Sequence, residues 1–106
     1  MLDEGLKTRG FPGIVFRDGP AGRRAALADG PDVWEIIRAL QLTPGKGEKR
    51  VSRLADQAGL SSRQVRLAVD YYSVFSEEID ERITEDERAA ERLRYRIQLR
   101  DSLVSG

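Results

Sequence analysis

The chain has 106 residues, of which 40% are hydrophobic and 34% are charged, and its 18 basic side chains equal its 18 acidic ones in number. A chain of this size and apolar content is expected to form one domain, and its zero net charge creates no overall attraction to nucleic acid. Cys and His are absent, which excludes disulfides, thiol nucleophiles, serine–histidine relays and the usual zinc sites. No apolar run could span a bilayer, so we expect a cytoplasmic protein with no membrane contact. We also expect no cofactor.

The first part of the chain predicts a lead-in over residues 1–13 and then a β-hairpin. The apolar residues 14–16 supply the first strand, and residues 23–27 supply the second. Residues 18–22 between them include Gly19, Pro20 and Gly22. This density of turn residues predicts a loop longer than two residues.

Three stretches then repeat the apolar spacing of an amphipathic helix. The first begins at Gly30-Pro31-Asp32 and ends before residues 43–47, which we expect to form a flexible basic loop. Gly59 separates the other two, and Ser61 with Gln64 fits a capping box at the start of the third. In chain order, the apolar stripes are Val33, Ile36, Ile37 and Leu40; Val51, Leu54, Ala55 and Ala58; and Val65, Ala68, Val69 and Tyr72.

Two further helices are expected towards the C-terminus. A short one opens at Ser76 and carries Ile79 and Ile83, and a second capping box at residues 84–87 starts the last helix. The predicted fold is therefore mostly α. It comprises a small helix-turn-helix domain over residues 14–83, with the short β-hairpin at its N-terminal end, and a C-terminal amphipathic helix over residues 84–106.

The stretch from Leu54 to Val65 has the features of a helix-turn-helix. Ala55 is the small residue needed where the two helices cross, Gly59 permits a left-handed turn, and Val65 anchors the second helix. Polar residues at the start of the second helix are then free to enter a major groove, where Arg reads guanine, Gln reads adenine and Ser holds phosphate. With the basic loop, the candidate DNA-binding residues are Lys46, Lys49, Arg50, Ser61, Ser62, Arg63, Gln64 and Arg66. The alternative is that the same motif serves only as a scaffold or for dimerisation.

A dense apolar segment follows the second helix of this motif. It contains Tyr71, Tyr72, Val74 and Phe75. These residues either form the interface of a homodimer, which would double the phosphate contacts to DNA, or close the core of the monomer against Trp34.

Several of these features resemble a prokaryotic family catalogued as domain of unknown function 433. The resemblance covers about Ile14 to Ile83, and rests on Gly22-Arg23-Arg24 with Leu27, the helix from Asp32 to Leu40, Leu60-Ser61, Val65, Ala68, Tyr71-Tyr72 and Glu77-Glu78-Ile79. It implies a small winged-helix-like protein without catalytic activity. Members are often antitoxins of the VapB type, encoded beside PIN-like ribonuclease toxins.

The last predicted helix has two apolar faces. Ala90, Leu93, Ile97 and Val104 lie on one face, and Tyr95, Leu99 and Leu103 lie on the opposite one. A surface helix on one core needs a single stripe, so the second face predicts a mate in a homodimer or a different partner. For a toxin with a carboxylate cluster as partner, the candidate partner-binding residues are Arg88, Arg92, Tyr95, Arg96, Leu99, Arg100 and Leu103.

Acidic residues crowd between Glu77 and Asp86, and pairs of carboxylates can catalyse hydrolysis or hold magnesium. Acids around helix starts are usually dipole partners, so we expect no enzyme and no metal site. The function expected is an antitoxin that neutralises a PIN-like ribonuclease and represses its own transcription, with double-stranded DNA, the toxin and a second copy as partners. The alternatives are a free-standing dimeric helix-turn-helix regulator and a dimerising adaptor that does not bind DNA.

Overall fold

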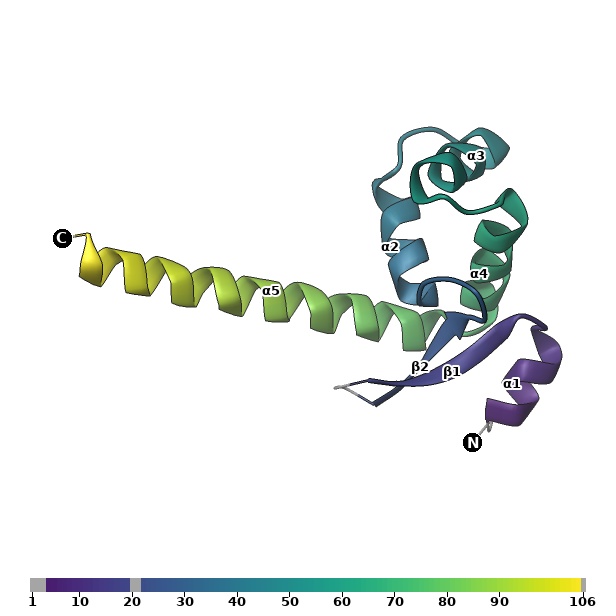
Figure 1. Cartoon of the computed structure of the whole chain (residues 1–106), viewed down its shortest axis with the longest axis horizontal. Helices are drawn as coiled ribbons and strands as arrows, with labels where there is room; N and C mark the ends of the chain where they lie inside the picture. The colour runs from purple at the N-terminus through teal and green to yellow at the C-terminus, as the bar shows by residue number, and fades with distance from the viewer. Residues whose placement is uncertain (1–3, 20–21, 106) are drawn as a thin grey trace.

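A computed structural model describes residues 4–19 and 22–105 of the chain (Figure 1). Its elements are, in order, α1 (Glu4–Gly10), β1 (Ile14–Gly19), β2 (Gly22–Leu27), α2 (Val33–Leu42), α3 (Gly47–Ala58), α4 (Ser62–Val74) and α5 (Ser76–Val104). The fold class is the expected one: mostly helical, with an antiparallel hairpin near the N-terminus and a long C-terminal helix.

The hairpin is tighter than its sequence predicts. Its register runs from Ile14 opposite Leu27 to Gly19 opposite Gly22, so only residues 20–21, which lie outside the described part, connect the strands. The expected longer loop is therefore wrong. The Arg17 guanidinium donates to the carbonyl oxygens of Leu27 and Gly30 at 2.8 and 3.0 Å, which fixes the chain where it leaves β2.

Part of the expected lead-in is a helix attached to the core. The Lys7 ammonium on α1 lies 2.7 Å from a carboxylate oxygen of Glu78 on α5 and 4.6 Å from the ring centre of Phe75. Phe11, which follows α1, meets the rings of Tyr71 and Phe75 edge-on, with centroids 5.3 and 6.0 Å away. The residues before the hairpin thus close one side of the domain.

The core forms around α2, which packs against β2, α4 and α5. Its members come from every element except α1, because each helix turns its apolar stripe inwards. α3 packs on α4 through Leu54 and Ala55. The buried apolar residues are Ile14, Ala25, Ala26, Leu27, Val33, Ile36, Ile37, Leu54, Ala55, Val65, Ala68, Tyr71, Ile79 and Ile83.

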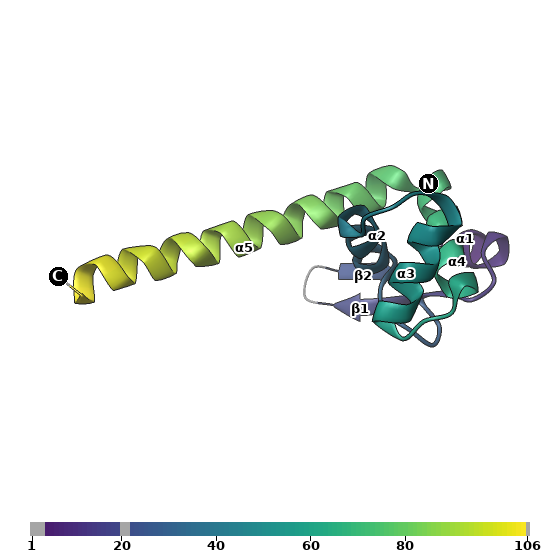
Figure 2. The same cartoon turned by 90° about the horizontal axis from the view of Figure 1, so that it is seen from above.

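The two helices expected beyond Ser76 are a single helix of 29 residues. No Gly or Pro interrupts the sequence between Ser76 and Val104, so the capping signal at Thr84 stays an exposed part of a continuous helix. Its buried residues are Ile79 and Ile83, and every residue from 91 to 105 is exposed. α5 therefore extends far beyond the domain, as both views show (Figures 1 and 2).

Candidate DNA and partner interfaces

The turn between α3 and α4 has the conformation that the motif requires. Gly59 adopts φ 69° and ψ 29°, the left-handed region that glycine enters without strain, and the Leu60 N–H donates to the Ala55 carbonyl at 2.9 Å. The capping box is confirmed. The Ser61 hydroxyl accepts from the Gln64 N–H at 3.1 Å, and the Gln64 side-chain oxygen accepts from the Ser61 N–H at 2.8 Å.

Basic residues lie near the start of α3 and in the first turns of α4. An exposed ion pair at 3.0 Å joins Arg66, in the second turn of α4, to Glu48, in the first turn of α3. Lys46 precedes α3, Lys49 is in its first turn, and Arg63 is three residues before Arg66 on α4. Among the described residues, the side chains of Lys46, Lys49 and Arg63 are exposed and form no hydrogen bond or ion pair, so their charges are available to a ligand.

Other candidates for DNA contact are engaged within the fold. The Gln64 amide nitrogen donates to Asp29 at 3.2 Å while its oxygen completes the capping box, so both ends of this amide are occupied. Ser61 is the cap itself, and Ser62 is half-buried. Arg50 donates to the Thr43 carbonyl at 2.9 Å and holds the segment before α3.

The loop expected over residues 43–47 lies between α2 and α3 and ends where α3 begins. α3 begins at Gly47, so Lys49 and Arg50 are helical. The paired strands lie at the opposite end of the domain from α3 (Figure 1). Within the described residues, the segment over 43–50 therefore contributes no strand to a wing.

The expected dimerisation segment is largely used inside the monomer. Tyr71 is fully buried, with its ring 4.8 Å from that of Phe75, so it cannot face a partner. Tyr72 and Phe75 are half-buried against the core, and only Val74 is exposed. This agrees with the alternative that the segment closes the monomer core, although Tyr71 and Phe75 meet Phe11 there rather than Trp34.

The hydroxyl of Tyr71 belongs to a polar network that we did not predict from the sequence. The Tyr71 hydroxyl donates to Glu78, whose oxygens lie at 3.0 and 3.2 Å, and the same carboxylate receives Lys7. Burial, and after it the charge of Glu78, raise the pKa of Tyr71 well above its ordinary value. The contact joins α1, α4 and α5, and sequence spacing gives no sign of it because 71 residues separate Lys7 from Glu78.

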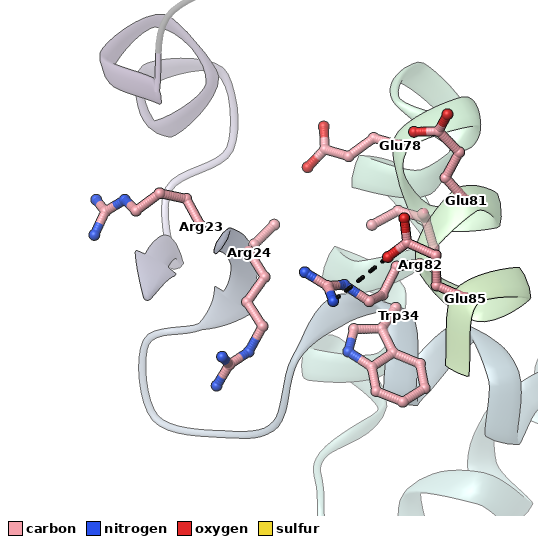
Figure 3. Close-up of a pocket in the computed structure, with 9 residues that line it drawn as sticks. Arg23, Arg24, Trp34, Glu78, Glu81, Arg82 and Glu85 are labelled. Atoms are coloured by element: carbon pink, nitrogen blue, oxygen red, sulfur yellow. Dashed lines mark ion pairs between the residues drawn. The ribbon is translucent and has the colours of Figure 1, made fainter. Parts of the chain in front are cut away.

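A small pocket lies between the hairpin, α2 and α5 (Figure 3). Its volume is about 200 Å³, and its lining carries both signs of charge, including the Arg82–Glu85 pair at 3.8 Å. Beside it, the buried Asp32 pairs with Arg24 and accepts the Trp34 indole N–H at 3.2 Å. The lining residues are Arg23, Arg24, Ala25, Trp34, Glu78, Ile79, Glu81, Arg82 and Glu85. Within the described residues, no three of the Asp, Glu, His or Cys type gather as metal ligands would.

The distal part of α5, residues 91–104, is apolar on two faces and lacks a cover. The stripe that buries Ile79 and Ile83 continues along the helix as Leu93 and Ile97, which are half exposed. The candidate partner-binding residues Tyr95, Leu99 and Leu103 are 62%, 47% and 86% exposed on the opposite face. The four candidate arginines, Arg88, Arg92, Arg96 and Arg100, are exposed beside that face.

Comparisons of the chain with family models, with curated proteins and with solved structures gave no match. The resemblance to the family of domain of unknown function 433 stays a prediction. No helix within the described residues is long and apolar enough to cross a membrane.

Proposed function

We propose that this protein is a non-catalytic antitoxin that neutralises a PIN-like ribonuclease and represses its own transcription by binding DNA as a homodimer. The observation that carries the proposal is the exposed distal part of α5. Its apolar residues are half to almost wholly exposed, while the core is closed without them. Exposed apolar side chains in such numbers mark a surface that a partner covers.

DNA binding is assigned to α3 and α4. Lys46 and Lys49 would contact phosphates, while Arg63 at the start of α4 would reach base edges. Arg66 can join them, because an exposed ion pair such as that with Glu48 contributes little and is exchanged readily for a phosphate. Ser61, Gln64 and Arg50 position the helices rather than read bases.

Toxin binding is assigned to the face of α5 that carries Tyr95, Leu99 and Leu103. This face would lie in an apolar groove of the nuclease, which is how amphipathic helices commonly bind their partners. PIN-like nucleases hold their metal with carboxylates, and the adjacent arginines would pair with these acids. The charge suits such a site, since five arginines face two acids between Arg88 and Val104.

Co-expression with the nuclease encoded in the neighbouring reading frame tests the proposal. The full chain should restore growth, whereas a chain ending at Glu91 should not. The shortened chain should keep its fold by circular dichroism, because residues 92–105 are exposed. Equal protection by the shortened chain, or a neighbouring frame that encodes no nuclease, would contradict the antitoxin assignment and favour a free-standing regulator.

A further inference from the structure

Two rows of like charge run along α5. Glu77, Glu81 and Glu85 follow one another at intervals of four residues in the first half, and Arg92, Arg96 and Arg100 do so in the second. All six side chains are exposed. Residues four apart are neighbours on a helix, and neighbours of like charge destabilise it. Each row therefore destabilises α5 locally, and opposite charges placed beside the row would offset this repulsion.

The helix itself does not supply that charge to the arginine row. No acidic residue stands three or four positions from Arg92, Arg96 or Arg100 along the sequence. Within the described residues, none of the three forms an ion pair. In the glutamate row, Glu77 and Glu81 have no basic residue three or four positions away, whereas Glu85 has Arg82, at 3.8 Å, and Arg88.

The two rows are mirror-placed about one point on the helix, between Arg88 and Ala89. Glu85 and Arg92 are the nearest to this point, Glu81 and Arg96 come next, and Glu77 and Arg100 are the outermost. We propose that a second copy of the chain pairs with α5 in antiparallel orientation, with the two-fold axis at this point. Each glutamate then stands level with an arginine of the mate, and symmetry forms every pair twice. A parallel pair would set each row against its own like charges.

The outer side of α5 has room for the mate. A shallow hollow along its first half is lined by Glu77, Asp80, Glu81, Thr84, Glu85 and Arg88. The distal half of the mate's helix would lie along this acidic hollow. Tyr95, Leu99 and Leu103 each follow an arginine of the row by three residues, so the same contact would cover them.

This interface replaces the one expected at Tyr71 and Tyr72. The proposed pairing does not require a nuclease partner. One consequence rests on the proposed function: the second copy and the nuclease would compete for the same arginines. Nuclease binding would then separate the two α5 helices.

Light scattering or sedimentation of the full chain, without nuclease, tests the pairing. At low salt, the wild type should have about twice the monomer mass of 11.9 kDa, and added salt should shift it towards the monomer. Arg92→Glu with Arg96→Glu should give monomers, and so should Glu81→Arg with Glu85→Arg. An equimolar mixture of these two variants should restore the dimer, because every pair is then of opposite charge.

Arg94→Glu is the matched control, because Arg94 is not part of the row and this change should leave the dimer intact. Circular dichroism should show the same helix content in all variants, since every substituted side chain is exposed. A monomeric wild type, variants that remain dimers, or folded variants that do not recombine in the mixture would each overturn the pairing. None of these results depends on whether a nuclease partner exists.

Discussion

Tyr71 shows how one side chain ties three helices together. Its ring fills the core between Phe11 and Phe75, while its hydroxyl reaches the carboxylate of Glu78 that also receives Lys7. A buried hydroxyl that lacks a partner costs free energy, so the position of Glu78 matters as much as the packing of the ring. The sequence places Tyr71 in a dense apolar segment that is expected to be buried, either in the monomer core or at a dimer interface. The partners of Tyr71 could not be predicted, because they come from distant segments.

We predict that Tyr71→Phe lowers the free energy of unfolding by about 1–2 kcal/mol, because it removes a hydrogen bond to a charged acceptor but keeps the ring. The raised pKa of Tyr71 adds a dependence on pH. The folded chain keeps the proton, whereas the unfolded chain loses it near pH 10, so stability falls as pH rises above about 10. Urea unfolding at neutral pH and above pH 10 checks this. A variant whose stability falls as steeply as that of the wild type would contradict the assigned role.

Arg63 and Lys49 should differ in what they contribute to DNA binding. Arg63→Ala should weaken binding to a specific site by about 1–3 kcal/mol and relax its sequence preference. Lys49→Ala should weaken binding to all sequences alike and reduce the salt dependence by about one unit of slope. Fluorescence anisotropy with upstream and scrambled DNA at several salt concentrations measures both effects. Unchanged binding in both variants would contradict the assignment of α3 and α4 to the DNA interface.

At the scale of elements, local signals predicted the middle of the chain well and its two ends poorly. The apolar stripes of α2, α3 and α4 are buried or half-buried as expected, except for Ala58, which is exposed. Gly59 and the Ser61–Gln64 capping box have their expected roles. The sequence of α1 contains two glycines and no stripe, and it is helical where Lys7 can reach Glu78. The sequence from Thr84 to Glu87 has the pattern of a capping box, but no Gly or Pro precedes it in α5, so the helix continues through this point.

Gly59→Ala should destabilise the turn between α3 and α4. A Cβ at this position meets nothing within 4 Å, so the cost comes from the left-handed backbone alone and should be about 1–2 kcal/mol. Gly10→Ala is the control, since a Cβ there also meets nothing and its φ is not positive. Thermal unfolding of the two variants compares them. Equal stability would mean that the turn does not need glycine.

At the scale of the whole molecule, two surfaces of different chemistry stand far apart. The described part of the chain extends over 56 Å along its longest axis, with the basic residues of α3 and α4 on the domain and the distal part of α5 beyond it (Figures 1 and 2). The zero net charge gives no hint of this separation, although the uneven order of charges along the sequence does. The described part of the chain therefore presents two separate surfaces, one on α3 and α4 and one on the distal part of α5.

Hydrogen exchange followed by mass spectrometry tests this division most directly. Upstream DNA should slow exchange at the start of α3 and of α4, around residues 46–66. In the monomeric Glu81→Arg/Glu85→Arg variant, whose distal α5 has no mate, the neighbouring nuclease should slow exchange over residues 91–104. Each ligand should leave the other's region unchanged when added alone. A nuclease footprint on α3 and α4, or no slowing anywhere in the distal part of α5, would contradict the account.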